Sequence, residues 1–206
     1  MLTAPVRTMI LMVRHAEVHN PKDIVYGRLP GFGLSPRGEI QAERVARFLS
    51  ARNADVIYTS PLLRARQTAS VIAGQSNTAT VRRSKSLIEV LTGYQGSPNS
   101  ILVGGFSFYT PVKREGDESM DDVLRRMTNF LSLVIKRHAG EEVIAVSHAD
   151  PIAILRLGLE GKPLTVENLH SVVYPERVSI NQIVLGPDHV PQLTYFDVVR
   201  SMETAA

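Results

Sequence analysis

Apolar residues along this chain form short continuous runs that alternate with stripes at helical spacing. The runs at 9–13 and 143–146 are apolar on both faces, as in strands buried within a sheet, and 55–58 reads as a further short strand. Strands that alternate with amphipathic helices predict a three-layer α/β/α fold with a mostly parallel central sheet. The helix stripes are Ala42, Val45, Ala46 and Leu49; Leu62, Ala65, Ala69 and Ile72; and Val123, Met127, Phe130, Leu131 and Val134.

Capping residues set the expected limits of several elements. Ser35 and Ser60 each stand before a proline and are predicted helix N-caps. Ser119, with Asp122 three residues later, resembles a capping box, and Gly140 ends the helix that follows. We also expect a helix at 149–159, late strands at 178–185 and 193–198 at an edge of the sheet, and frayed ends at the first few residues and at 201–206.

The length of the chain, 206 residues, suits a single domain over 1–206. The segment 93–117 interrupts the pattern, because it holds five glycines and two prolines and has no periodicity. Long irregular segments of this kind are usually functional or disordered. We therefore expect a loop-rich insertion there instead of a second domain.

Composition excludes several classes of function. With no cysteine, the chain has no disulfide framework, no thiolate nucleophile and no zinc site built on sulfur. No apolar run approaches the roughly 20 residues of a membrane span, and no export signal is evident, so a cytoplasmic protein without a membrane partner is expected. The net charge of +3 suits anionic substrates, but only 6% of residues are aromatic and none cluster with basic residues, which argues against a nucleic-acid partner.

Basic side chains follow three of the predicted strands. His15 and His148 come directly after the two buried runs, and Arg64 lies in the first turn of the helix that follows 55–58. Ligands of open α/β sheets bind beyond the carboxyl ends of the strands, so these groups and Arg14 should converge on one cationic pocket. Arginine side chains match phosphoryl oxygens in a bidentate way, and a histidine supplies a nucleophile. The pattern indicates a phosphoryl-transfer site.

Four motifs resemble those of the histidine phosphatase superfamily, branch 1, whose members are phosphoglycerate-mutase-like. RHAE at 14–17 resembles the family's Arg-His-Gly-Glu signature, with alanine in place of glycine. SPLLRARQTA at 60–69 resembles the second arginine motif, SHA at 147–149 the second histidine motif, and LSPRGEIQA at 34–42 the start of the first crossover helix. The chain departs from the family at Val18, where a hydroxyl is common, and at Asn20, which arrives one residue early.

The resemblance implies a role for each site residue. His15 would be the nucleophile that becomes phosphohistidine, and Arg14, Arg64 and His148 would bind the phosphoryl oxygens. Asn20 would be a further phosphate contact. Glu89, in SLIEV at 86–90, matches the acid that protonates the leaving oxygen, and its competitors for that role are Glu115, Asp117 and Glu118. The insertion at 93–117 would cover the pocket, and its candidate contacts, with two residues from the first motif loop, are Tyr94, Phe106, Phe108, Tyr109, Lys113, Arg114, Tyr26 and Arg28.

The function expected from these residues is a phosphatase of the histidine acid type, a phosphomonoesterase acting on a small phosphorylated metabolite. No metal or other cofactor is needed, because cationic side chains neutralise the phosphoryl charge and nearby arginines would repel a metal ion. Two alternatives stay open, a cofactor-dependent phosphoglycerate mutase and a non-catalytic phosphate-binding regulatory protein. Sugar phosphates, a phosphoglycerate and a nucleoside-type phosphate all fit as substrates, and the predicted assembly is a homodimer through the late edge strands.

Overall fold

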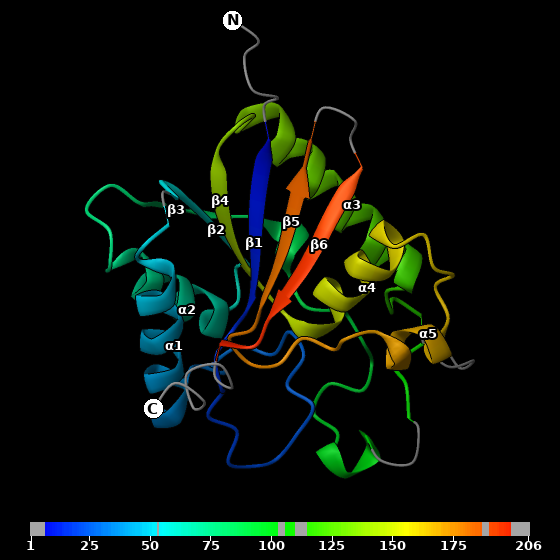
Figure 1. Cartoon of the computed structure of the whole chain (residues 1–206). Helices are drawn as coiled ribbons and strands as arrows, with labels where there is room; N and C mark the ends of the chain where they lie inside the picture. The colour runs from blue at the N-terminus through cyan, green and yellow to red at the C-terminus, as the bar shows by residue number, and fades with distance from the viewer. Residues whose placement is uncertain (1–6, 53, 103–105, 110–114, 187–189, 199–206) are drawn as a thin grey trace, which may run out of the picture.

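The computed structural model of the chain describes residues 7–52, 54–102, 106–109, 115–186 and 190–198, and the ends predicted to be frayed lie outside these residues. Its centre is a six-stranded sheet with the order β3-β2-β4-β1-β5-β6 (Figure 1). Within it β3, β2, β4 and β1 are mutually parallel, and β5 runs against its two neighbours. The strands are β1 (Thr8–Arg14), β2 (Val56–Thr59), β3 (Thr80–Arg83), β4 (Glu142–Ser147), β5 (Ile180–Leu185) and β6 (Pro191–Phe196).

Helices cover both faces of the sheet, which confirms the predicted three-layer α/β/α fold (Figure 1). On one face lie α1 (Pro36–Leu49) and α2 (Leu63–Ala73), and on the other α3 (Met120–Arg137) and α4 (Ala149–Leu159). The remaining elements are α5 (Val166–Ser171) and the short 3-10 helices η1 (Lys85–Leu87) and η2 (Asn99–Leu102). Among the described residues, no helix is both long enough and apolar enough to cross a bilayer.

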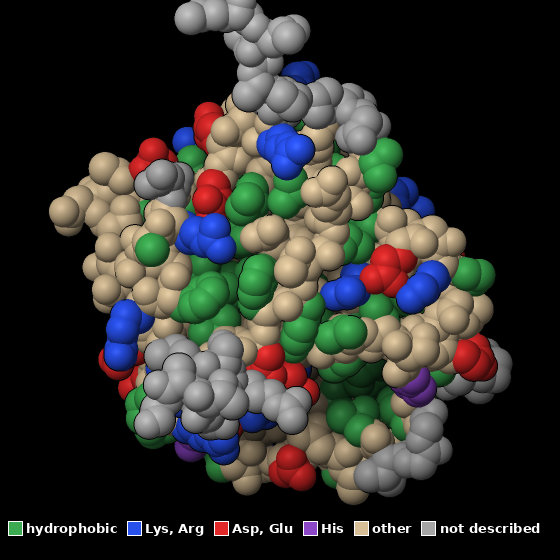
Figure 2. Space-filling view, viewed as in Figure 1, with side chains coloured by type: hydrophobic (Ala, Val, Ile, Leu, Met, Phe, Trp, Pro, Cys, Tyr) green, Lys and Arg blue, Asp and Glu red, His purple; other side chains and the backbone are tan. Residues whose placement is uncertain are grey.

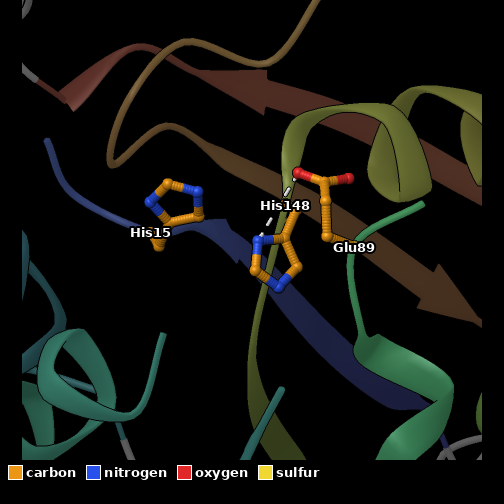
Figure 3. Close-up of side chains that lie close together, drawn as sticks. All are labelled: His15, Glu89 and His148. Carbon is orange, nitrogen blue, oxygen red and sulfur yellow. Dashed lines mark ion pairs between the residues drawn. The ribbon is translucent and has the colours of Figure 1, made fainter. Parts of the chain in front are cut away.

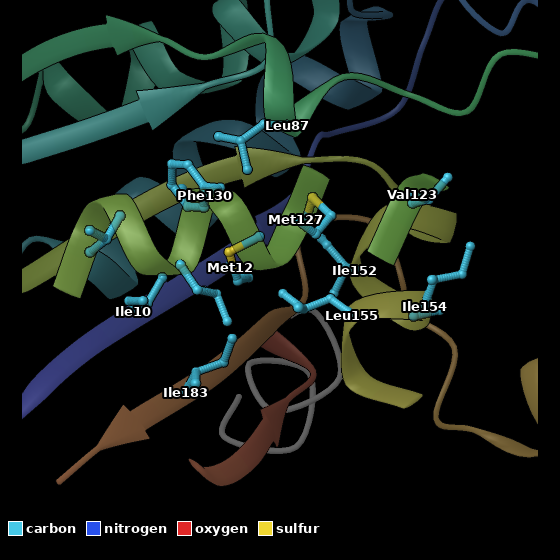
Figure 4. Packing of buried hydrophobic residues seen from close by; sticks show 14 of the residues in the cluster. Ile10, Met12, Leu87, Val123, Met127, Phe130, Ile152, Ile154, Leu155 and Ile183 are labelled. Atoms are coloured by element: carbon cyan, nitrogen blue, oxygen red, sulfur yellow. The ribbon is translucent and has the colours of Figure 1, made fainter. Parts of the chain in front are cut away.

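Each face of the sheet has its own hydrophobic core. Ile10 and Met12 of β1 face the core with Phe130 of α3 (Figure 4), whereas Leu11 and Val13 face the core under α1 and α2. Successive side chains of a strand point to opposite faces, so a strand covered on both sides is apolar throughout. This double burial explains why β1 and β4 were predictable as continuous apolar runs.

Several predicted limits are confirmed and others are wrong. Ser35 caps α1 by accepting a hydrogen bond from the Gly38 amide at 3.0 Å, and the capping box of Ser119 is present. Ser60 does not cap α2, because the helix begins at Leu63 and its N-cap residue is Leu62. The Ser60 hydroxyl instead forms a hydrogen bond with a histidine described below. The first late strand is shorter than predicted, because β5 starts only after Val178, whose φ is 55°. The second, β6, has the predicted length but lies two residues earlier in the chain.

The prediction missed β3 and α5. All four residues of β3 are exposed at the edge of the sheet, so no apolar alternation marks the strand. Helix α5 is only six residues long and buries a single side chain, Leu169. Neither element presents the apolar stripe on which periodicity depends.

Helix α1 packs unusually close to the segment that follows β1. A Cβ atom built on Gly38 would lie 2.1 Å from the backbone oxygen of Glu17, closer than any real contact, so only glycine fits. Because Glu17 is the third residue after β1, this contact sets the course of the chain just beyond the strand. The carboxyl ends of β1, β2 and β4, with the long connecting loops, meet in the lower half of Figure 1.

Candidate active site

His15 is the first residue after β1, and its side chain is buried. Its Nδ1 lies 2.7 Å from the Ala16 carbonyl oxygen, which accepts only, so Nδ1 carries the proton and Nε2 the lone pair. The Arg64 Nε donates to that Nε2 at 3.2 Å. Burial, and then the charges of Arg64 and Arg14, hold the pKa of His15 well below its ordinary value. The imidazole is therefore neutral and presents a nucleophilic nitrogen.

Arg64 is the second residue of α2 and is almost fully buried. Its guanidinium lies 4.7 Å from the centre of the Tyr26 ring, and its Nη2 donates to the Gly27 carbonyl at 2.8 Å. Both contacts come from the loop between β1 and α1, so this loop and the first turn of α2 fix the cation against His15. A buried guanidinium stays protonated and is suited to hold phosphoryl oxygens.

Arg14 ends β1 and reaches the pocket from the other side. Its Nη1 donates to the Pro175 carbonyl at 2.7 Å, and the guanidinium lies 6.0 Å from the Tyr174 ring. The Nε of Arg14 is buried and has no hydrogen-bond partner among the described residues. A buried unpaired donor is costly, and a bound anion would satisfy it.

His148 follows β4, and its ring lies edge-on to that of His15, with centroids 5.0 Å apart (Figure 3). The Ser60 Oγ lies 2.8 Å from His148 Nε2 and also accepts from the Leu62 amide at 3.4 Å. Because that amide already supplies one proton to Oγ, we assign the hydroxyl as the donor to Nε2 and the ring proton of His148 to Nδ1. Among the described residues that Nδ1 has no hydrogen-bond partner. Burial, then the charges of Arg64 and His15, keep the pKa of His148 well below its ordinary value.

Glu89 lies just beyond η1, and its carboxyl is 3.6 Å from His148 Nδ1 (Figure 3). The same carboxyl is 4.0 Å from Arg64 Nη2. One carboxyl oxygen accepts from the Val90 amide at 2.9 Å. Burial, followed by the nearby charge of Asp150, raises the pKa of Glu89 from 4.5 to about 7, although Arg64 opposes the shift. The carboxyl therefore holds a proton near neutral pH, as a general acid must.

The three competing acids lie elsewhere. Glu118 is paired with Arg28 at 2.6 Å and with Arg126 at 3.0 Å, and it accepts from the Leu91 amide at 3.1 Å. Arg28 also donates to the Glu89 carbonyl at 2.6 Å, so the ion pairs of Glu118 help to fix the backbone at Glu89. Asp117 accepts from the Gly93 amide at 2.6 Å, and Glu115 is exposed. None of the three acids lines the pocket described next.

A pocket of about 490 Å³ opens beside these groups, and Arg14, His15 and Glu89 line it. Asn20 also lines it, but its side chain is engaged locally: Nδ2 donates to the Ile24 carbonyl at 2.9 Å and Oδ1 accepts from the Ile24 amide at 3.3 Å. Of the six predicted residues, the structure brings His15, Arg64, Glu89 and His148 into contact with one another. Arg14 and Asn20 line the adjoining pocket. A phosphate contact by Asn20 stays a prediction.

The structure places the predicted substrate contacts differently from one another. Tyr26 and Phe108 line the pocket, whereas Arg28 is paired with Glu118. Tyr94 and Phe106 pack with Phe108 in one aromatic cluster. Lys113 and Arg114 lie outside the described residues, and Tyr109 donates to Asp150.

Sequence reasoning missed Asp150 and Tyr174, which both line the pocket. Asp150, two residues after His148, is buried and accepts from Tyr109 at 2.9 Å and from Tyr174 at 2.5 Å. Its place in the first turn after the second histidine was the only available signal. The two tyrosines come from separate loops without periodicity, so no pattern could have paired them with the carboxylate.

One group among the described residues has the spacing of a metal site. His15, Glu89 and His148 each offer one possible ligand atom, and these three atoms lie within 4.8 Å of one another. Arg64 donates directly to His15 and lies 4.0 Å from Glu89, so its permanent charge opposes a cation at this position. Since the same arginine favours an anion, we assign no metal to the cluster.

The fold and the pocket define an α/β protein that places arginine side chains beside a neutral, buried histidine at the carboxyl ends of parallel strands. The chain belongs to the histidine phosphatase superfamily (branch 1), whose family model matches residues 10–197.

The chain is similar to two curated proteins and to a solved structure, and phosphatase names are carried by one of the two proteins and by the structure. Phosphoserine phosphatase 1 of Hydrogenobacter thermophilus is 34% identical over 169 residues, covering 76% of this chain and 78% of its own. An uncharacterised Mycobacterium tuberculosis protein, Rv0525, is 39% identical over 167 residues, covering 78% of this chain and 82% of its own. The solved structure of a mycobacterial glucosyl-3-phosphoglycerate phosphatase superposes with a TM-score of 0.72 at 25% identity, over 86% of this chain and 90% of that one.

Proposed function

We propose that this protein is a phosphomonoesterase that hydrolyses a small phosphorylated metabolite through a phosphohistidine on His15. The observation that carries the proposal is the cluster around that residue. The neutral imidazole of His15 lies in a cluster with two buried donors, Arg14 Nε and His148 Nδ1. Neither donor has a hydrogen-bond partner among the described residues. A phosphoryl group would satisfy both donors while its phosphorus faces the nucleophile. Superfamily membership and the phosphatases among the relatives support the same reaction.

In the first half-reaction the lone pair of His15 Nε2 attacks phosphorus, and the bond from phosphorus to the ester oxygen breaks. Arg14, Arg64 and His148 donate hydrogen bonds to the three phosphoryl oxygens, over which charge spreads in the transition state. Glu89 transfers its proton to the departing oxygen, so the product leaves as a neutral alcohol. A donor of this kind is worth roughly 10²–10⁴ in rate for an alkoxide leaving group.

In the second half-reaction water attacks the phosphorus of phosphohistidine. The Glu89 carboxylate accepts the proton of the attacking water, the bond to Nε2 breaks, and inorganic phosphate forms. His15 regains its neutral state with the proton still on Nδ1, which the Ala16 carbonyl holds. Glu89 is protonated again and ready for the next ester.

The finer assignment as an acid-type phosphatase rests on Glu89. Its proton is needed in the first step, and its pKa of about 7 means that the reactive form declines above neutral pH. We therefore expect an optimum on the acidic side of neutrality. The single-domain organisation over 1–206, the cytoplasmic location and the homodimer are parts of the same proposal that stay predictions.

The decisive experiment is a quench assay in EDTA. The protein is incubated with radiolabelled phosphomonoester, quenched in alkali, and examined for phosphohistidine beside a His15→Ala variant. His19→Ala is the matched control, because this histidine lies four residues away, is exposed, and does not line the pocket. We expect label and turnover in the wild type and the control, and neither in His15→Ala.

Three outcomes would contradict the proposal. Label that forms but is not released to water would favour the mutase alternative, since a mutase returns the phosphoryl group to an acceptor. Absence of label across a broad panel of phosphorylated metabolites would favour the regulatory alternative. Loss of turnover in EDTA would show that a metal ion is required.

A further inference from the structure

A second hollow of about 440 Å³ adjoins the catalytic pocket near α5. Figure 2 shows a hollow floored by hydrophobic side chains in the lower right of the molecule, in the region where Figure 1 places α5. We call it the aromatic hollow, and most of its described lining is apolar or aromatic. These residues are Leu102, Phe106, Phe108, Tyr109, Leu169 and Tyr174.

The aromatic hollow adjoins the catalytic pocket, because the same residues line both. Leu102, Phe108, Asp150 and Tyr174 line both. Leu102 and Tyr174 are 44% and 45% exposed, which is high for apolar side chains of this size. A group that leaves the catalytic pocket along this shared wall therefore enters a space lined by uncovered apolar surface.

The walls of the aromatic hollow are held in place without a ligand. Phe106 and Phe108 pack edge to face with centroids 5.5 Å apart. Tyr109 and Tyr174, from different loops, both donate their hydroxyl protons to Asp150, which is buried. A preformed apolar site loses little conformational freedom on binding, which favours affinity.

Charge separates the aromatic hollow from the catalytic pocket. The described residues that line it include no lysine or arginine, and its basic side chain is a single histidine, His170, whereas Arg14 and Arg177 line the catalytic pocket. The carboxylate on the shared wall, Asp150, repels a second anion. The hollow therefore suits a neutral apolar or aromatic group and disfavours a carboxylate or a second phosphate.

We propose that the aromatic hollow binds the distal part of the leaving alcohol, so that the preferred substrate is a phosphomonoester whose alcohol carries a neutral apolar or aromatic group. This inference rests on the proposed phosphatase function. It separates this chain from an enzyme selective for short, carboxylate-bearing esters such as phosphoserine.

The test compares two alkyl esters whose leaving alcohols have matched acidity, phenylpropyl phosphate and propyl phosphate. Because the chemistry is matched, their ratio of kcat/KM reports binding of the phenyl ring alone. Burial of an aromatic ring should favour phenylpropyl phosphate by about tenfold or more. We also expect propyl phosphate to exceed phosphoserine. A ratio near one, or a preference for phosphoserine over both alkyl esters, would overturn the inference.

Phe106→Ala removes one wall of the aromatic hollow without touching the lining of the catalytic pocket. It should reduce the ratio by about fivefold. Phe48→Ala is the matched control, since Phe48 is a partly exposed phenylalanine of α1 that lines neither space, and it should leave the ratio unchanged.

A binding measurement keeps the inference separate from the reaction. Phenylpropanol, the product alcohol, is titrated into the His15→Ala protein and into the same protein with Phe106→Ala or Phe48→Ala added, followed by ligand-observed NMR. Binding that weakens only with Phe106→Ala supports the aromatic hollow even if no ester is hydrolysed, in which case the phosphatase proposal alone fails. Absence of phenylpropanol binding, or equal binding by all three proteins, would overturn the inference while leaving the phosphatase reaction intact.

Discussion

Replacing Glu89 by glutamine separates the chemical role of this residue from its effect on stability. With a pKa of about 7, the carboxyl is protonated in about half of the molecules at pH 7. A carboxyl with the ordinary pKa of 4.5 would be protonated in roughly 0.3% of them, so the environment increases the acid form roughly 150-fold. Glutamine keeps the shape of the side chain and has no proton to transfer.

For the reaction, we expect Glu89→Gln to reduce kcat/KM for an alkyl phosphate by roughly 10²–10⁴. The loss for para-nitrophenyl phosphate should be much smaller, because nitrophenolate leaves without protonation. The decline of kcat/KM above pH 7 should also disappear with the alkyl ester. Steady-state rates of both esters from about pH 5 to pH 9 measure all three effects.

The raised pKa favours the reaction but lowers the stability of the folded protein above neutral pH. The folded protein binds more protons than the unfolded chain between pH 4.5 and about pH 7, so the free energy of unfolding falls as the pH rises through this window. The shift corresponds to about 3 kcal/mol above pH 7. Urea denaturation should therefore show Glu89→Gln to be more stable than the wild type at pH 8, by up to about 3 kcal/mol, and similar at pH 4.

Each half of this prediction can be refuted by its own result. A stability difference that is equal at both pH values would mean that Glu89 titrates normally, and the reasoning from burial and from Asp150 would be refuted. Equal loss of rate for the alkyl and nitrophenyl esters would refute the assignment of Glu89 as the proton donor.

Three further substitutions test other parts of the site. Asp150→Asn removes the charge that helps to raise the pKa of Glu89, so the decline of kcat/KM should move to lower pH by about one unit in a pH–rate profile. Ser60→Ala removes the hydroxyl that orients the second histidine, and we expect kcat/KM to fall about tenfold with a melting temperature within a few degrees of the wild type. Gly38→Ala places a methyl group against backbone and should lower the free energy of unfolding by about 2 kcal/mol or more, whereas Gly74→Ala, with neighbours no closer than 3.5 Å, should cost less than about 1 kcal/mol.

The three-layer fold and the class of reaction were predictable because the ends of buried strands can be located from apolar runs, and the superfamily was predictable from its motifs. His15 and His148 follow the two strands that are buried on both faces, so a continuous apolar run located each histidine. Arg64 follows from the helix that begins after β2. Glu89 lies on no strand end and was found only through resemblance, which periodicity could not replace.

What could not be predicted depends on contacts between distant loops. Ser60 resembled a helix cap because serine before proline is common at helix starts, but its hydroxyl bonds His148, 88 residues away. Asp150 meets Tyr109 and Tyr174 across 41 and 24 residues. Such pairs leave no periodic signal, since the tertiary fold alone brings them together.

The groups proposed to handle the phosphoryl group and those that form the aromatic hollow come from different parts of the chain. The former end β1 and β4 or begin α2, inside the packed sheet and its helices, whereas Phe106, Phe108 and Tyr174 lie in loops that precede α3 and β5. Loops accept substitutions and insertions that a packed sheet does not. A library randomised in these loops should therefore yield variants that hydrolyse new esters at undiminished intrinsic rates, while equal diversity at the strand ends should yield mostly inactive protein. Related sequences can acquire new metabolite repertoires by the same route, with the chemistry inherited unchanged.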